Sequence, residues 1–234
     1  MPKIRLGSPK LIPVLFIAMF VVLPNRAKAD KLFVPQTYPT VQAAVDAAVS
    51  GDIIVIWEGV YSGQGNYNIS TRGKALTITS SGSQTILDAE QLGRLFLITD
   101  GEARSTVISN LTLRNGLVDD LEQDGGAILI NNSSPIIHNC HIIDNSLTGS
   151  NCGGAGIGID GGAPLIENCV FAGNINSSGL GEGGGLSARH GAQVDIVGCH
   201  FINNISNSGG GLAVDGAAAV IVDSSFRFNE STSG

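Results

Sequence analysis

Residues 137–145 have the sequence Ile-His-Asn-Cys-His-Ile-Ile-Asp-Asn, and variants of this phrase return at residues 166–174, 196–204 and 221–229. Each copy ends in an asparagine, and these asparagines belong to a series with spacings of 30, 29, 30 and 25 residues: Asn115, Asn145, Asn174, Asn204 and Asn229. Glycine clusters separate the copies, at residues 125–126, 153–154, 183–185 and 209–211. A period of this kind indicates a repeat protein.

The composition of the repeat favours strands over helices. Glycine-rich stretches such as residues 153–159 disfavour helical repeats, because each glycine costs about 1 kcal/mol relative to alanine in a helix. Short β-branched and aromatic runs bounded by Gly, Asn and Asp are typical of strands. Three such runs occupy the first repeat, at residues 127–130, 135–137 and 140–143. The predicted fold is therefore all-β, a parallel β-helix with three strands in each coil.

Equivalent residues of successive coils should stack in columns about 4.8 Å apart. We expect two inward columns, one of Ile137, Ile166, Ile196 and Ile221 and one of Ile142, Phe171, Phe201 and Phe226. The repeated asparagine amides should donate to one neighbouring coil and accept from the other. A further column should hold Cys140, Cys169 and Cys199, with Asn110 and Ser224 at the same position, as small buried residues rather than a disulfide framework. Cys152 lies in a loop, and its state is left open.

Residues 1–29 are predicted to be a secretory signal peptide. Lys3, Arg5 and Lys10 precede a 13-residue apolar run from Leu11 to Leu23, and Ala27-Lys28-Ala29 is typical of a cleavage site. The run is too short to span a bilayer, which needs about 20 residues. We therefore expect export with cleavage after Ala29, an extracellular or outer-surface location, and no transmembrane segment in the mature chain.

Charge argues against a nucleic-acid partner. Removal of residues 1–29 leaves 8 basic against 20 acidic residues, a formal net charge of −12. Such a surface repels phosphate backbones, and the basic residues do not cluster. The simpler explanation of the negative charge, which we favour, is solubility outside the cell.

One amphipathic helix is predicted near the start of the mature chain, over residues 40–49. Thr40 is the expected N-cap, and Val41, Ala44, Val45 and Ala48 form one apolar face. A helix placed before the first coil should cover the open end of the stack. We thus divide the mature chain into an N-terminal cap (30–52) and a β-helix (53–234) that is regular from about residue 107. No capping sequence follows Asn229, so the β-helix is expected to continue beyond residue 234.

Two resemblances follow from particular motifs. The segment from Tyr38 through Gly51-Asp52 to Tyr61 resembles the N-terminal cap and first coil of pectin-lyase-like right-handed parallel β-helices. Residues 125–128, Gly-Gly-Ala-Ile, and the Phe-x-x-Asn phrases that begin at Phe171, Phe201 and Phe226 are similar to repeats of polymorphic outer membrane proteins. The second resemblance implies surface display and adhesion, although the chain has only one complete Gly-Gly-Ala-Ile and no membrane barrel.

Aligning the repeats backward from the ladder asparagines places Asn131, Asp160, His190 and Asp215 at one equivalent position. Two carboxylates two coils apart would lie about 10 Å from each other, near the upper limit for inverting glycoside hydrolysis. The structural alternative is that Asp160, His190 and Asp215 each precede glycine in tight turns, where Asn, Asp and His tolerate a left-handed backbone. We favour the structural interpretation.

The loops that follow the ladder asparagines should all emerge on one side and could form a binding surface. The first loop carries Asp119, Asp120, Glu122 and Asp124, enough oxygen ligands for calcium but without the spacing of a known calcium loop. A solvated acidic loop is the favoured alternative. No other cofactor is predicted.

Two functions remain open at this stage. The first is an exported or surface-displayed β-helix with a structural, adhesive or glycan-contacting role and no catalytic site. The second is an extracellular polysaccharide lyase or glycoside hydrolase that uses Asp160, His190 and Asp215. The residues favour the first: Arg189-His190-Gly191 is only part of the Gly-His-Gly phrase that polygalacturonase-like sites carry, and there is no nucleophile elbow or P-loop.

Overall fold

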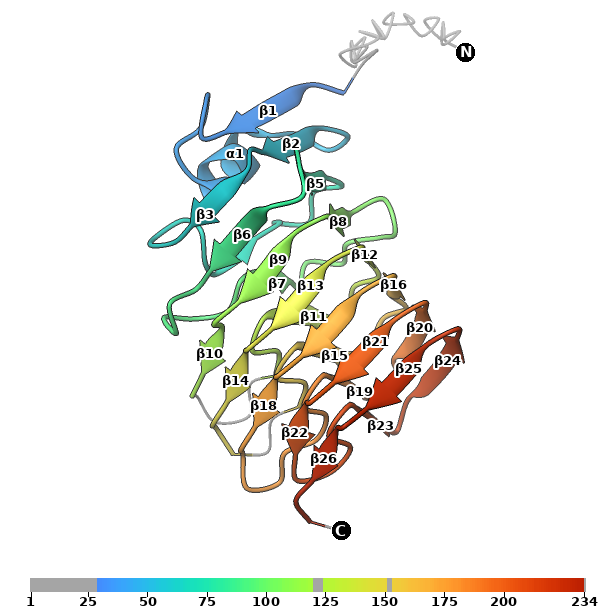
Figure 1. Cartoon of the computed structure of the whole chain (residues 1–234). Coiled ribbons are helices and arrows are strands. Elements are labelled where there is room, and N and C mark those ends of the chain that lie inside the picture. The colour runs from blue at the N-terminus through green and yellow to red at the C-terminus, as the bar shows by residue number, and fades with distance from the viewer. Residues whose placement is uncertain (1–28, 120–123, 151–152, 234) are drawn as a thin grey trace, which may run out of the picture.

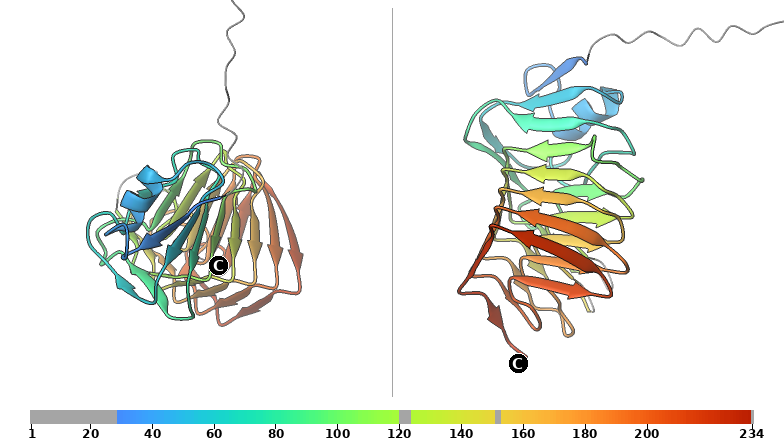
Figure 2. Two further views of the ribbon diagram at one scale, coloured as in Figure 1. Left: turned by 90° about the horizontal axis from the view of Figure 1, so that it is seen from above. Right: turned by 90° about the vertical axis from the view of Figure 1, so that its right-hand side faces the viewer.

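The computed structural model describes residues 29–119, 124–150 and 153–233. In this part of the chain the strands form four parallel sheets that run along a stack of coils. Each strand pairs with its equivalents in adjacent coils (Figure 1). Figure 2 shows the coils piled along one axis, with the cap at the N-terminal end. The prediction of a parallel β-helix is confirmed.

The eight-stranded sheet starts in the cap and runs the length of the rod. Its strands, in spatial order, are β1 (Lys31–Val34), β2 (Ile53–Ile56), β5 (Thr77–Ser80), β8 (Val107–Ser109), β12 (Ile136–His138), β16 (Leu165–Glu167), β20 (Gln193–Val197) and β24 (Ala218–Val222).

The seven-stranded sheet follows one short turn later in each coil. It consists of β3 (Gly59–Tyr61), β6 (Thr85–Asp88), β9 (Thr112–Arg114), β13 (His141–Ile143), β17 (Val170–Ala172), β21 (His200–Ile202) and β25 (Ser225–Arg227).

The six-stranded and five-stranded sheets close the coil. The six-stranded sheet contains β4 (Ile69–Ser70), β7 (Phe96–Ile98), β11 (Ile128–Asn131), β15 (Ile157–Asp160), β19 (Leu186–Arg189) and β23 (Leu212–Asp215). The five-stranded sheet contains β10 (Leu117–Val118), β14 (Ser146–Leu147), β18 (Ile175–Asn176), β22 (Ile205–Ser206) and β26 (Glu230–Ser231). The three strands expected in each coil are present. The five-stranded sheet adds a fourth strand of two residues, which is too short to show hydrophobic alternation in the sequence.

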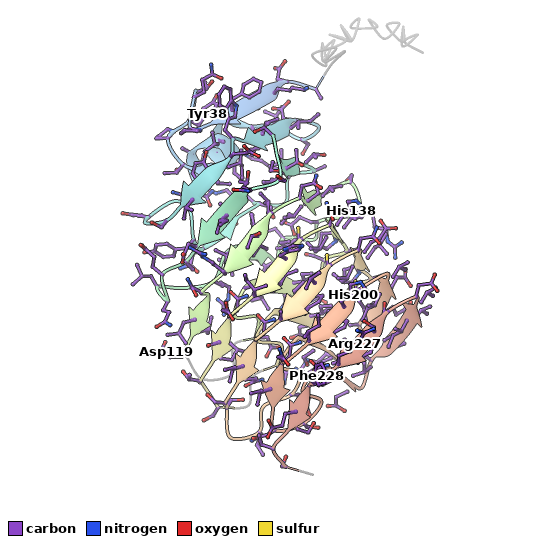
Figure 3. All side chains as sticks on the ribbon, viewed as in Figure 1. Tyr38, Asp119, His138, His200, Arg227 and Phe228 are labelled. Atoms are coloured by element: carbon purple, nitrogen blue, oxygen red, sulfur yellow. The ribbon has the colours of Figure 1, made fainter. Side chains whose placement is uncertain are left out.

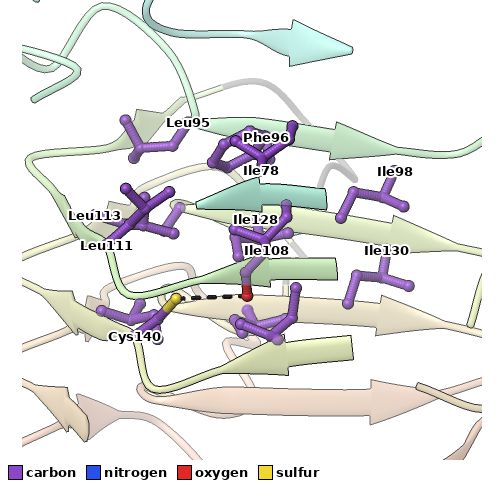
Figure 4. Packing of buried hydrophobic residues seen from close by; sticks show 14 of the residues in the cluster. Ile78, Leu95, Phe96, Ile98, Ile108, Leu111, Leu113, Ile128, Ile130 and Cys140 are labelled. Atoms are coloured by element: carbon purple, nitrogen blue, oxygen red, sulfur yellow. Dashed lines mark hydrogen bonds between the residues drawn. The ribbon is translucent and has the colours of Figure 1, made fainter. Parts of the chain in front are cut away.

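The two inward columns pack as predicted. Ile137, Ile166, Ile196 and Ile221 are register partners, and so are Ile142, Phe171, Phe201 and Phe226. The three phenyl rings stack nearly parallel, with centroids 4.5 and 4.6 Å apart. Figure 4 shows another part of the same core, in which Ile78 lies above its register partner Ile108. Burial in one continuous column makes each coil depend on the next.

The asparagine ladder joins the coils through their side chains. Asn145 Nδ2 donates to Asn174 Oδ1 (2.9 Å), Asn174 Nδ2 donates to Asn204 Oδ1 (2.9 Å), and Asn204 Nδ2 donates to Asn229 Oδ1 (2.9 Å). Each Nδ2 also donates to a backbone carbonyl of the preceding coil, for example Asn174 to Ile142 (2.9 Å). The predicted exchange of hydrogen bonds between coils is confirmed.

Asn115 does not belong to this ladder, contrary to its spacing. Arg114 pairs with Ile143, so Asn115 aligns with Asp144, and both have a left-handed backbone (φ 54° and 55°). Gly116 takes the ladder position, and its N–H donates to Asn145 Oδ1 at 2.8 Å. The Asn115 amide instead donates to Asp88 (2.9 Å).

The cysteine column is buried and reduced. Cys140, Cys169 and Cys199 are free thiols whose Sγ atoms donate to carbonyls of the preceding coil, including Cys140 to Ile108 (3.7 Å; Figure 4). Burial and the neighbouring thiols raise the pKa of Cys169, so this thiol stays protonated at neutral pH. Ser224 shares the column as expected, but Asn110 does not. Leu111 occupies that position because Asn110 aligns with Asn139. Cys152 lies outside the described residues.

Helix α1 (Val41–Ala47) covers the N-terminal end of the stack. Thr40 caps it by accepting a hydrogen bond from Ala43 N–H (3.2 Å), and Val41, Ala44 and Val45 are buried. The helix ends two residues before the predicted limit of residue 49, since the backbone of Ala48 is extended. Lys74 Nζ donates to the carbonyls of Val45 (2.6 Å) and Ala48 (2.8 Å), which satisfies the helix C-terminus from the next coil.

Candidate functional site

The candidate catalytic residues lie on or beside the outer side of the six-stranded sheet. Register pairs Asn131 with Asp160, Asp160 with Arg189, and Arg189 with Asp215. Arg189, not His190, therefore completes the column. The backward alignment from the asparagines failed because this coil has one extra residue between Arg189 and Ile196. Counting six residues forward from the left-handed glycines of the clusters identifies the column correctly.

His190 occupies the turn that follows the column. Its backbone is left-handed (φ 51°), as are Asn132, Gly161 and Gly216 at the same turn of other coils. The left-handed turn expected of His190 is thus confirmed. The same expectation is wrong for Asp160 and Asp215, which end strands β15 and β23 without a left-handed backbone, because the turn begins one residue later. Its Nδ1 lies 2.8 Å from Asp160 Oδ1, and both side chains are solvent-accessible, His190 at 70% and Asp160 at 32%. The structure brings these two candidates together although they are in different columns.

Arg189 forms an ion pair with Asp124 that sequence analysis did not anticipate. The two are 65 residues apart, and only 13% of the Arg189 side chain and 6% of the Asp124 side chain are exposed. Burial alone would lower the pKa of Arg189, but the hydrogen bond and charge of Asp124, with the charges of Glu182 and Asp160, raise it. The guanidinium is therefore permanently charged and held within an acidic surround.

Backbone and side-chain groups of the surrounding loops hold Asp124 in place. Asp124 Oδ1 also accepts a hydrogen bond from Gly153 N–H (2.7 Å), and Arg94, itself buried, donates to the Asp124 carbonyl (3.1 Å). Gly158 lies beneath Asp124, and a Cβ there would meet the Asp124 Cβ at 2.5 Å. Gly153, Glu182 and Ser208 form parallel bridges to one another, so successive loops stack as the coils do.

This arrangement limits the chemistry that the column can perform. Asp160 and Asp215 are separated by two coil spacings, about 10 Å, and Arg189 stands between them as a neutralising partner. A permanently charged guanidinium that is bound to a buried carboxylate is a poor proton acceptor. From Asp160 through Arg189 to Asp215 the column alternates in charge on adjacent strands, an order that favours sheet pairing.

The calcium candidates are divided between separate places. Asp124 is buried in the ion pair, Asp119 is exposed beside β10 at the edge of the rod (Figure 3), and Asp120 and Glu122 lie outside the described residues. Over residues 29–119, 124–150 and 153–233, no group of three or more His, Cys, Asp or Glu side chains is placed to hold a metal ion. Asp124 is thus not the solvated loop residue that we favoured.

The hollows on the described surface include the following three. One, of about 400 Å³, lies along β20 and β24, where Arg104 reaches across the coils to Asp195 (2.6 Å). A second, of about 370 Å³, lies near Arg94 and Asp119. A third, of about 500 Å³, lies where the eight-stranded sheet turns into the seven-stranded sheet, at residues 80–83 and 110–112 with Asn139 and His141.

Strand pairing and register define a parallel β-helix protein. The chain matches the family model of the right handed beta helix region over residues 66–230, and it belongs to this family. No curated protein and no solved structure matches it. The structure contains no helix, in the residues it describes, with the length and apolarity required to cross a membrane.

Proposed function

We propose that the protein is an exported or surface-displayed β-helix module that has a structural and adhesive role and contacts glycans outside the cell, without catalysis in this segment. One observation carries the non-catalytic part of the proposal. The only cationic residue of the candidate column, Arg189, is buried against Asp124 and is not free to act on a substrate. The signal-peptide pattern of residues 1–29 and the resemblance to polymorphic outer membrane protein repeats support export and display.

The shape of the protein supports a contact role. A stack of coils presents outward side chains in straight columns at the strand spacing, which suits an extended ligand. The outer face of the seven-stranded sheet carries Thr112, His141, Val170, His200 and Ser225 in one such column, and none of these is acidic or a lysine or arginine. Because the mature chain is expected to carry −12 charges, neutral glycans are favoured over polyuronates.

A second function, polysaccharide cleavage, is supported by one observation. Asp160 and His190 form an exposed acid–imidazole contact of 2.8 Å, and Asp215 is exposed on the same side of the sheet two coils from Asp160. Such a pair could act as a general base. The competing role of His190 is to hold a left-handed turn, and Asp160 and Asp215 end strands β15 and β23.

The two functions are separated by measuring binding and turnover together. The purified protein is incubated with soluble β-glucan, mannan and polygalacturonate, with and without calcium, and both retention and newly formed sugar ends are measured. We expect binding without turnover. Turnover that is lost in Asp160→Asn, while circular dichroism shows an intact fold, would establish the enzyme and overturn the proposal.

A further inference from the structure

The third hollow exists because one coil has a longer turn than those that follow it. Thr79 pairs with Ser109 and Ile86 pairs with Thr112, so six residues connect the sheets in this coil and only two in the next. The coil after that again uses two residues, between His138 and His141. The extra residues form a ledge over the compact turns below. We call this place, lined by residues 80–83 and 110–112 with Asn139 and His141, the polar hollow.

The lining of the polar hollow is polar but uncharged. Serine, threonine and asparagine side chains provide most of it, and it includes no Asp, Glu, Lys or Arg. The other two hollows each contain charged residues, namely Arg104 with Asp195 and Arg94 with Asp119.

The amides of the polar hollow are held in place before any ligand arrives. Asn110 and Asn139 both have left-handed backbones (φ 59° and 50°), and Asn139 Nδ2 donates to Asn110 Oδ1 at 2.7 Å. Asn110 Nδ2 donates to Thr79 Oγ1 at 3.0 Å. The ledge is fixed as well, because Glu58 Oε1 accepts from Ser83 N–H (3.0 Å). Fixed groups lose little conformational entropy on binding.

Several polar atoms of the polar hollow remain available. Within the described part of the chain, Thr112 Oγ1, Asn139 Oδ1 and the ring nitrogens of His141 make no hydrogen bond. His141 is exposed, and Thr112 is its register partner in the preceding coil. Together with the ledge serines they present both donors and acceptors to one space.

We infer that the polar hollow binds a neutral, hydroxyl-rich sugar. Its volume of about 500 Å³ is within the range of small-molecule sites, roughly 300–1,000 Å³. A phosphate or sulfate group would need a cationic side chain, which the lining lacks, and a uronate would meet the field of an acidic chain. Sugar hydroxyls match the mixture of donors and acceptors. This inference rests on the proposed glycan-contacting function and adds the place and the class of sugar.

The test compares the whole protein with variants of the polar hollow. Binding of soluble β-glucan, mannan and polygalacturonate is measured by calorimetry for the unaltered protein, His141→Ala, Thr112→Val and Ser81→Trp. His138→Ala is the matched control, because His138 lies on the outer side of the eight-stranded sheet, its side chain is 40% exposed, and it is outside the polar hollow. Circular dichroism verifies that each variant is folded.

We expect a neutral glycan to bind, with affinity lowered about 3- to 10-fold by His141→Ala or Thr112→Val, abolished by Ser81→Trp and unchanged by His138→Ala. Equal binding by all the variants would overturn the polar hollow as the site while leaving a glycan-contacting function in place. Binding of polygalacturonate alone would overturn the inference of a neutral sugar. Failure to bind any of the three would instead overturn the proposed glycan contact, and this inference with it.

Discussion

At the scale of single residues, the coils close because particular positions accept a left-handed backbone or a buried amide. One turn carries Asn115, Asp144, Gly173, Asn203 and Phe228 in successive coils, all with positive φ. Asn, Asp and Gly adopt this conformation readily, whereas a bulky residue is strained there. Phe228 is also 82% exposed, so no packing offsets the strain.

Replacing Phe228 with Asn should therefore stabilise the protein. The residue adopts φ 56° in an exposed turn, and relief of this strain is expected to raise the free energy of unfolding by about 0.5–1 kcal/mol. Urea denaturation measures the change. Ile202→Thr is the control. Ile202 is the register partner of Arg227, the residue before Phe228, and it lies in a strand, so its substitution should not raise the free energy of unfolding.

The asparagine ladder makes a second prediction at this scale. Asn174 is fully buried, and its side chain bonds to Asn145 N–H (3.1 Å), to the Ile142 carbonyl and to Asn204. Asn174→Ala leaves several of these groups buried without partners, so we expect a loss of about 2–4 kcal/mol in the free energy of unfolding. The control is Asn203→Gly. Asn203 is exposed beside the ladder residue Asn204, and glycine retains the left-handed turn, so stability should change by less than about 0.5 kcal/mol. Equal effects of the two substitutions would rule out the ladder as a source of stability.

At the scale of elements, side-chain hydrogen bonds join turns of adjacent coils that lie outside the paired strands. Glu102 is buried and accepts hydrogen bonds from Thr71 Oγ1 (2.5 Å), Gly73 N–H (2.9 Å) and Ser133 Oγ (2.9 Å), which come from the coils on either side. Burial alone would raise the pKa of Glu102, but hydrogen bonds from Thr71 Oγ1, from its own N–H and from the N–H groups of Gly73 and Asp100 lower it below the usual value. The ionised carboxylate therefore links adjacent coils through hydrogen bonds.

Glu102→Gln should lower the free energy of unfolding at neutral pH by about 1–3 kcal/mol, because an amide turns a donor toward Thr71 or Gly73. The folded pKa is depressed, so the carboxylate's contribution is fully present above the pKa of the unfolded chain and is lost as pH falls through the folded value. The stability difference between the unaltered protein and Glu102→Gln should thus shrink on acidification. Denaturation curves between pH 7 and pH 3 measure it, and a difference that grows toward low pH would contradict this assignment.

At the scale of the whole molecule, a stack of coils must protect its ends. At the N-terminal end α1 buries Val41, Ala44 and Val45 against the first coil, and Lys74 of the following coil caps the helix. Without this cover, the strand edge and core of the first coil would be open to pairing with another chain.

Val45→Asp should expose this end and cause self-association. A carboxylate at a fully buried position cannot be accommodated without displacing the helix. Size-exclusion chromatography with light scattering should show oligomers or aggregates for Val45→Asp. Val49→Asp introduces the same charge two residues beyond α1 at a position that is 48% exposed, and it should remain like the unaltered protein.

Export is also a property of the whole chain. If residues 1–29 are a signal peptide, the protein made in a secreting bacterial host should appear outside the cytoplasm with Asp30 as its first residue, as determined by N-terminal sequencing. Replacing Ala27 and Ala29 with bulky residues should block cleavage. A cytoplasmic product that retains residue 1 would refute the prediction.

The sequence by itself determined the period, the isoleucine and phenylalanine columns, the asparagine ladder and the N-terminal helix, because in-register stacking repeats one local pattern at every coil. Only the tertiary structure decided where the non-repeating residues lie. It placed Arg189 in the column assigned to His190, since one extra residue in a turn shifts the count. It also joined Arg189 to Asp124 and set a longer turn over Asn110 and Asn139. These contacts depend on how turns and loops of different lengths pack across coils, and no periodic signal encodes that packing.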